Sequence, residues 1–165
     1  ADNTAVIETA RHVSLSLENG RIHLDGKDIQ DRLHSDSVDA FVAQHSANIE
    51  VRHIVNRLIR SLTADTNAVI EGRDIGTVVY PDADYKVYLD ASPRVRAERR
   101  FNQGISENSI EELEKNIQMR DAIDKNKKEG SLKVADDAYY LDTSYLTIEG
   151  VCEKVERFFN ERGSI

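Results

Sequence analysis

The sequence predicts an α/β protein in which a small antiparallel lobe precedes a parallel sheet covered by helices. The first section of the chain alternates apolar and polar residues around Asn-Gly and Asp-Gly pairs, which is typical of β-hairpins. The second section alternates short apolar runs with helical patterns, which is typical of parallel sheets. A chain of 165 residues, 39% of them hydrophobic, suits one core with a small appended lobe.

The first lobe is expected to span residues 1–64. An antiparallel meander is predicted over residues 12–30, because the Asn-Gly and Asp-Gly pairs within it accept the positive φ angles that type I′ turns need. Helix, in two segments, is predicted over residues 37–62. The helical period is clearest at four residues spaced three or four apart, Val51, Val55, Leu58 and Leu62.

The α/β core is expected to span residues 65–165. Strands are predicted at residues 68–70, 85–89 and 139–141. Helices are predicted to begin at Pro93, Ile110 and Ile148. This alternation indicates parallel strands joined by crossover helices.

Two of these helix starts carry capping signals. Ser92 supplies a capping hydroxyl directly before a proline, and Ser109 with Glu112 makes a capping box. Between the two helices, residues 101–108 are polar and include a glycine, which predicts a loop. This loop is expected to belong to a lid segment of about residues 101–130.

Charge and composition exclude several classes of protein. The formal net charge of −8 argues against binding to nucleic acid polymers, whose affinity depends on clustered Lys and Arg. No apolar run approaches the roughly 20 residues that cross a bilayer, so no membrane partner is expected. Cys152 is the only cysteine, which leaves no intrachain disulfide, and its helical setting predicts a buried thiol. We therefore expect a cytoplasmic protein.

The stretch EGRDIGT, residues 71–77, directly follows the predicted strand at 68–70. In open α/β sheets ligands bind beyond the carboxyl ends of the strands, so charged side chains at this point are candidate site residues. The spacing alone is equally consistent with a surface turn that carries an Arg-Asp pair.

Residues 72–83 read GRDIGTVVYPDA, which resembles the GRD-x-GTVV-F/Y-PDA signature of bacterial cytidylate kinases. The resemblance covers essentially the whole chain and continues at residues 86–92, 96–100, 120–126 and 141–144. It implies the parallel sheet of a P-loop nucleoside monophosphate kinase-like fold, with a small antiparallel insert that binds CMP. It also implies transfer of a phosphoryl group from ATP, with Mg²⁺, to CMP or dCMP.

The resemblance assigns Arg73 to the monophosphate and Asp74 to the amino group of cytosine. These roles suit the residues, because an arginine fork matches phosphate oxygens and a carboxylate accepts from an amino group that uracil lacks. Arg52 takes the place of an arginine that reads the acceptor edge of the base, although it also fits an exposed helix residue. The family has a serine that assists this contact, and by spacing it would fall near Ala43 of this chain. The pattern departs there, which leaves open whether Ser46 or water replaces the serine.

Arg120 and Asp124 lie four residues apart on one helix face, with Lys127 three residues further on. As a plain ion pair they would contribute only about 0.3–0.5 kcal/mol. The resemblance implies instead that Arg120 and Asp124 grip the ribose hydroxyls. The family usually carries arginine at the positions of Ile123 and Lys127, so the phosphate-facing charge of the lid is reduced here.

Arg96 and Arg100 lie four apart on a helix that follows a predicted strand, and they are expected to face the transferring phosphoryl group. Arg99 points elsewhere by the same helical spacing. Glu71 takes the place of an aspartate in many relatives, where a carboxylate could hold a water bound to Mg²⁺. A solvated acid at a strand end is the other interpretation of Glu71.

The 165 residues contain no G-x-x-x-x-G-K-[ST] loop, whose amides and lysine hold the phosphates of ATP. The resemblance implies that this loop and the first strand precede Ala1. We therefore expect these residues to be inactive alone, and either to self-associate or to bind the missing N-terminal segment. Two alternatives remain: a noncatalytic remnant that binds pyrimidine nucleotides or a partner, and an α/β interaction domain unrelated to nucleotides.

Overall fold

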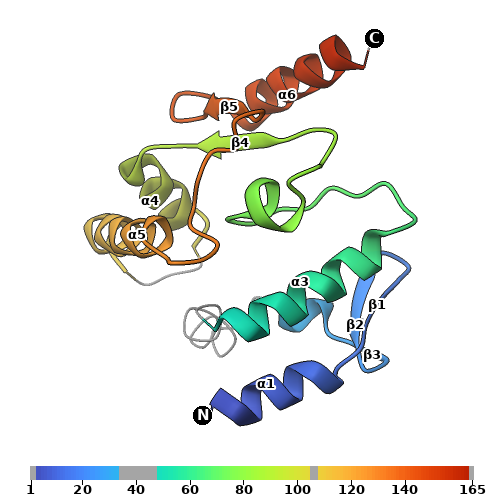
Figure 1. Cartoon of the computed structure of the whole chain (residues 1–165). Helices are drawn as coiled ribbons and strands as arrows, with labels where there is room; N and C mark the ends of the chain where they lie inside the picture. The colour runs from blue at the N-terminus through green and yellow to red at the C-terminus, as the bar shows by residue number, and fades with distance from the viewer. Residues whose placement is uncertain (1–2, 34–47, 105–107, 164–165) are drawn as a thin grey trace. The chain divides into compact units, whose positions relative to one another are not determined.

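The computed structural model describes residues 3–33, 48–104 and 108–163 (Figure 1). The chain divides into two compact units, Ala1–Ile70 and Glu71–Ile165. Each unit has its own secondary structure and is described separately below.

A three-stranded antiparallel sheet forms the meander of the first unit. Its strands β1 (Leu15–Glu18), β2 (Arg21–Leu24) and β3 (Lys27–Asp28) pair in the order β1-β2-β3. The turn residues Asn19 and Gly20 have φ angles of 53° and 76°, and Asp25 and Gly26 have φ angles of 50° and 74°. Positive φ at both central residues is the signature of type I′ turns, so the prediction of two tight hairpins is confirmed.

Helices complete the first unit. The helix α1 (Asn3–His12), for which the sequence pattern predicts nothing, lies alongside α3 (Ile49–Thr63), and Arg11 of α1 forms an ion pair with Glu50 of α3. A short 3₁₀ turn, η1 (Gln30–Arg32), follows β3. The side chain of Asn48 caps α3 by accepting from the amides of residues 50 and 51. The predicted helix is thus confirmed over residues 49–62, while residues 37–47 lie outside the described part of the chain.

The second unit contains a parallel strand pair, β4 (Val87–Asp90) and β5 (Tyr139–Asp142), which lie side by side in Figure 1. The helices are α4 (Pro93–Asn102), α5 (Ile110–Lys125) and α6 (Ile148–Arg162). Ser92 caps α4 through the amide of Val95, and Ser109 and Glu112 form a reciprocal capping box at α5. The predicted alternation of strands and helices is confirmed here.

Apolar and aromatic contacts hold the second unit together. Tyr139 of β5 stacks on Phe158 of α6 with ring centroids 4.6 Å apart, and Tyr85 meets Phe159 edge-on at 4.7 Å. Helices α4 and α5 pack against each other. The buried apolar side chains of this unit are Val79, Ala91, Ala97, Leu113 and Leu141.

Two predictions are wrong. Residues 68–70 form no strand, and the side chain of Val69 is fully exposed; within the described residues no strand lies beside this segment to complete a ladder. The thiol of Cys152 is exposed rather than buried. Six residues separate Cys152 from Phe158, which places it about 120° around α6 from the side chain that packs on the sheet.

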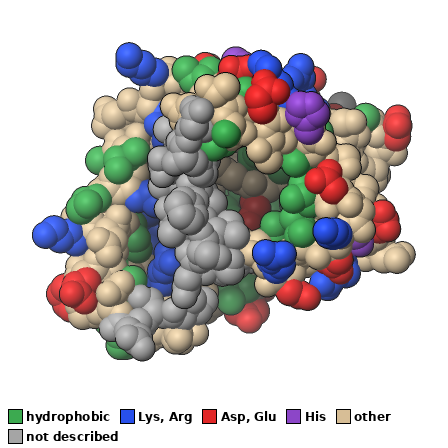
Figure 2. All heavy atoms as spheres, turned by 90° about the horizontal axis from the view of Figure 1, so that it is seen from below, with side chains coloured by type: hydrophobic (Ala, Val, Ile, Leu, Met, Phe, Trp, Pro, Cys, Tyr) green, Lys and Arg blue, Asp and Glu red, His purple; other side chains and the backbone are tan. Residues whose placement is uncertain are grey.

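The surface mixes both signs of charge. On the face shown in Figure 2, acidic and basic side chains are interspersed. Within the described residues, no helix combines the length and hydrophobicity that a membrane span requires.

Candidate functional site

The GRDIGTVV stretch forms a wide helical turn rather than a simple loop. In the π-helical segment η2 (Ile75–Val79), the Tyr80 amide donates to the Ile75 carbonyl at 2.7 Å. The backbone carbonyl of Asp74 accepts from the amides of Val78 at 2.9 Å and Val79 at 3.3 Å. Asp74 is only 7% exposed and Val79 is buried. Single π-helical turns occur frequently at functional sites, so this segment is a candidate for holding Asp74 in a defined position.

A buried ammonium group lies beside this turn. Lys86 is 8% exposed, and its Nζ donates to the carbonyl of Pro81 at 2.5 Å and to both carboxylate oxygens of Asp137 at 2.9 and 2.7 Å. The hydrogen bonds from Lys86 to Asp137 lower the pKa of that carboxylate. A pocket of about 440 Å³ opens at this point and includes Gly76 and Lys133 in its lining.

A buried carboxylate on α5 attracts three cations. The Asp124 side chain is 6% exposed, and Lys127 Nζ lies 2.7 Å from its Oδ1. Its Oδ2 lies 3.6 Å from Nε of Arg73 and 3.9 Å from Nε of Arg120. These two distances exceed hydrogen-bonding range, and this buried Oδ2 has no hydrogen-bond partner among the described residues. A donor on a bound ligand would complete the coordination of this oxygen.

A second carboxylate on α5, that of Asp121, binds Arg96 of α4. Arg96 donates from Nη1 and Nη2 to the two oxygens of Asp121, at 3.0 and 2.5 Å, and from Nε to the carbonyl of Ala91 at 2.9 Å. The hydrogen bonds from Arg96 lower the pKa of Asp121 and raise that of Arg96. Arg99 is turned toward Thr143 and donates to its hydroxyl at 3.0 Å.

The two carboxylates belong to one charged cluster, defined here as Arg73, Arg96, Arg120, Lys127, Asp121 and Asp124. Arg73 acts on both carboxylates. It lies near Asp124, and its charge lowers the pKa of Asp121, although the hydrogen bonds from Arg96 are the larger cause. The cluster holds four cations against two carboxylates. Such an excess of positive charge, partly buried, suits an anionic ligand.

The remaining sequence-predicted residues lie elsewhere or are less constrained. Arg100 and Glu71 are exposed. Arg52 lies in the first turn of α3, in the unit of residues 1–70. Ala43 and Ser46 lie outside the described residues.

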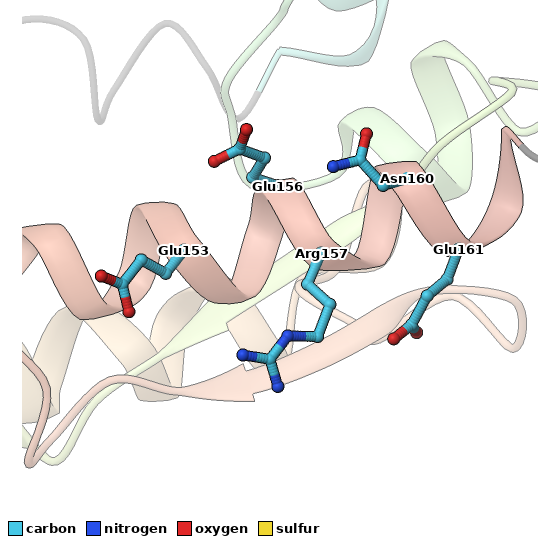
Figure 3. A pocket seen from close by; sticks show the side chains of 5 residues that line it. All are labelled: Glu153, Glu156, Arg157, Asn160 and Glu161. Atoms are coloured by element: carbon cyan, nitrogen blue, oxygen red, sulfur yellow. The ribbon is translucent and has the colours of Figure 1, made fainter.

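Another hollow of the second unit has a separate set of lining residues. It measures about 530 Å³ along α6 and is lined by polar side chains of that helix alone (Figure 3). Its residues are Glu153, Glu156, Arg157, Asn160 and Glu161. None of the sequence-predicted site residues lines this hollow.

Sequence reasoning missed Asp121, Lys86 and Asp137. A signal existed for Lys86, because a charged residue inside the apolar run at 85–89 needs a buried partner. No spacing rule could have paired it with Asp137, which lies 51 residues away. The same applies to Arg96 and Asp121, which are 25 residues apart.

Metal ligands are sparse in the described part of the chain, which contains no group of three or more His, Cys, Asp or Glu residues able to hold an ion. Mg²⁺ in nucleotide enzymes is bound by one or two carboxylates together with substrate phosphates, so a protein cage is not required. The exposed carboxylate of Glu71 is compatible with that arrangement.

Comparison with known proteins identifies relatives across the chain. The family model "Cytidylate kinase" matches residues 1–161. The chain is 40% identical over 148 residues to a cytidylate kinase of Borreliella burgdorferi (strain ZS7), covering 88% of this chain and 67% of that protein. It is 43% identical over 139 residues to a cytidylate kinase of Borrelia hermsii (strain HS1 / DAH), covering 83% of this chain and 64% of that protein. The chain therefore spans about two thirds of the length of these relatives.

Proposed function

We propose, because this chain belongs to the cytidylate kinase family, that it supplies the monophosphate-binding part of an enzyme that phosphorylates CMP or dCMP with ATP. The observation that carries the proposal is the buried Asp124 carboxylate, which has cations around it and one oxygen without a hydrogen-bond partner in the described residues. A nucleoside monophosphate offers both an anion and hydroxyl donors. The lone cysteine and the use of ATP favour a reducing cytoplasm.

In this proposal each end of the nucleotide has its own partners. Arg73 binds the phosphate. Asp124 accepts hydrogen bonds from the ribose hydroxyls, and Arg120 donates to them. The buried carboxylate of Asp74 accepts from the amino group of cytosine. The role of Arg52, donation to the acceptor edge of the base, is proposed from the family resemblance alone. The Asp74 contact would favour CMP, because uracil carries a carbonyl oxygen where cytosine carries the amino group that a carboxylate accepts from.

The phosphoryl transfer requires positive charge around the moving group. Arg96, Arg100 and Lys127 are the proposed sources, since positioning and neutralisation account for most catalysis of this type. Arg96 already donates to Asp121 from both terminal nitrogens, so the phosphoryl oxygens would share its guanidinium with Asp121 or displace that carboxylate. When bound, Mg²⁺ would neutralise phosphate charge, and Glu71 is the proposed residue that holds its water.

The ATP side of the reaction needs a phosphate-binding loop that these 165 residues do not contain. We propose that these residues alone do not transfer phosphoryl groups. The strand that leads into such a loop would lie beside β4, whose only partner in the described residues is β5. The lack of the loop motif also keeps a second candidate function open, a noncatalytic module that binds pyrimidine nucleotides.

Base selection tests the proposal directly. Calorimetric titration of the 165-residue chain with CMP and UMP should show preference for CMP. Steady-state kinetics should show the same preference in the chain completed with an N-terminal phosphate-loop segment, which is called the full-length protein below. Asp74→Ala should lower the preference by removing the acceptor for the amino group. Asp82→Ala, an exposed acid eight residues away, is the matched control and should leave the preference unchanged. Equal losses of CMP and UMP affinity in Asp74→Ala would remove Asp74 from base recognition.

A further inference from the structure

We infer that Lys86 is a positioning residue that fixes the base-selecting carboxylate of Asp74, and that Asp137 holds Lys86 in place. The inference rests on the proposed function, in which Asp74 reads the amino group of cytosine. Neither Lys86 nor Asp137 is expected to contact the nucleotide. Their role is to set the position of the turn that carries Asp74.

Lys86 is hydrogen-bonded to the chain just beyond the far end of that turn. Lys86 immediately precedes β4, and its ammonium donates to the carbonyl of Pro81 at 2.5 Å. Pro81 lies near the end of the GRDIGTVVYPDA stretch, residues 72–83, which begins two residues before Asp74. A charged donor on a backbone carbonyl is a strong restraint, so the end of the stretch is fixed to the start of the strand.

The aliphatic stem of Lys86 closely approaches the turn at Gly76. A Cβ built on Gly76 would lie 3.3 Å from Cδ of Lys86 and 3.5 Å from its Cγ. The lysine side chain therefore runs directly beneath the backbone two residues after Asp74. Because protein interiors are closely packed, a shift of this stem is transmitted to the turn.

Backbone hydrogen bonds connect the turn to Asp74. The carbonyl of Asp74 accepts from the amides of Thr77, Val78 and Val79 at 3.3, 2.9 and 3.3 Å. These bonds place Asp74 directly before the helical turn, as its N-cap residue. Movement of the turn relative to β4 would thus move the Asp74 backbone and redirect its buried carboxylate.

A purely stabilising role explains the lysine less well. The Lys86 side chain is 7% exposed while its partner Asp137 is 55% exposed, so the ammonium loses its hydration and the carboxylate keeps much of its own. Buried ion pairs often contribute little to stability compared with apolar residues of similar volume. A methionine would fill the same space without this desolvation cost. A methionine could not donate a hydrogen bond to the Pro81 carbonyl, as the Lys86 ammonium does.

The test compares base preference with stability in the full-length protein. The ratio of kcat/KM for CMP to that for UMP is measured for Lys86→Met and Asp137→Ala, together with the midpoint of thermal unfolding. Both variants should lower the ratio roughly tenfold, because a misplacement of about 1 Å can cost about a hundredfold in rate and a smaller shift of the reading group is expected here. Asp136→Ala, an exposed neighbour in the same pocket lining, is the matched control and should keep the ratio. Asp137→Glu should restore most of it.

The outcomes separate this inference from the proposed function. A ratio that stays at the unchanged protein's value in both variants, with a lower unfolding midpoint, would overturn the positioning role alone. A lack of CMP preference in the unchanged protein would overturn the inference together with the proposed function. If Lys86→Met does not fold, Asp137→Ala and Asp137→Glu still decide the question, because both retain the buried lysine.

Discussion

Asp121 of α5 accepts two hydrogen bonds from the guanidinium of Arg96 on α4, at 3.0 and 2.5 Å. A third bond, from Nε of Arg96 to the Ala91 carbonyl, ties the same side chain to the end of β4. The arginine thus joins α4, α5 and the sheet. Three of the five N–H groups of the guanidinium have an acceptor here, so a phosphoryl group would bind the remaining two or displace Asp121.

The Arg96–Asp121 pair should make stability depend on pH in the acid range. Hydrogen bonds from Arg96, with further contributions from Arg73 and Lys125, lower the folded-state pKa of Asp121 despite its burial. The stabilisation is therefore complete above the unfolded-state pKa of about 3.9 and is lost as the pH falls through the lower folded-state pKa. Asp121→Asn should reduce the free energy of unfolding by about 1–3 kcal/mol at pH 7, as expected for charged hydrogen bonds.

Urea unfolding at a series of pH values checks this prediction. The difference between the unchanged protein and Asp121→Asn should be constant from pH 7 to about pH 5 and should shrink below about pH 4. The exposed acid Asp82, changed to asparagine, serves as the control. A difference that grows toward low pH would contradict the assigned direction of the pKa shift.

Asp124→Asn should raise KM for CMP and leave KM for ATP nearly unchanged, because the two nucleotides have separate sites in the proposed enzyme. The change removes the negative charge that Lys127, Arg73 and Arg120 surround. Steady-state kinetics of the full-length protein measure both constants. Glu111→Gln, an exposed acid at the start of the same helix, is the control. Altered thermal stability with unaltered kinetics would support a plain ion-pair role for Asp124.

Gly76→Ala should reduce the preference for CMP over UMP, though by less than loss of the Lys86 ammonium. The added methyl group would lie 3.3 Å from Cδ of Lys86, which is closer than an ordinary contact, so the lysine stem or the turn must shift by a few tenths of an ångström. Gly150→Ala is the control for adding a methyl group. Its Cβ would meet only Thr147, at 3.6 Å, and in α6 it should stabilise the protein by about 0.5–1 kcal/mol.

The two glycine variants are compared by thermal unfolding and by the kcat/KM ratio for the two nucleotides. An unchanged ratio in Gly76→Ala would show that the turn tolerates displacement without moving Asp74. That result would count against the role assigned to Lys86.

The 165 residues by themselves should not release ADP from ATP in the presence of Mg²⁺ and CMP. Without the amides and lysine of a phosphate loop, the transferring group cannot be aligned with its acceptor. A coupled ADP-release assay on the purified chain, with its mass confirmed by mass spectrometry, measures this. The full-length protein is the positive control. Turnover above background by the 165-residue chain would refute the prediction.

Local signals in the sequence determined much of the secondary structure. The Asn19-Gly20 pair, the capping box of Ser109 with Glu112 and the cap of Ser92 act between residues at most three apart, and all three are realised. Such features depend on backbone geometry and nearby hydrogen bonds, so they can be predicted without knowledge of the fold. The strand expected at residues 68–70 failed because a strand also requires a neighbour, which local sequence cannot supply.

The sequence also determined the chemical character of the candidate site, through the GRD motif and the spacing of Arg120, Asp124 and Lys127. Only the tertiary structure decided which charges meet. It directs Arg96 to Asp121, 25 residues away, and buries the ammonium of Lys86 against Asp137, 51 residues away. Electrostatic partners are chosen by distance and burial in space, and both depend on how parallel strands and their crossover helices bring remote segments together.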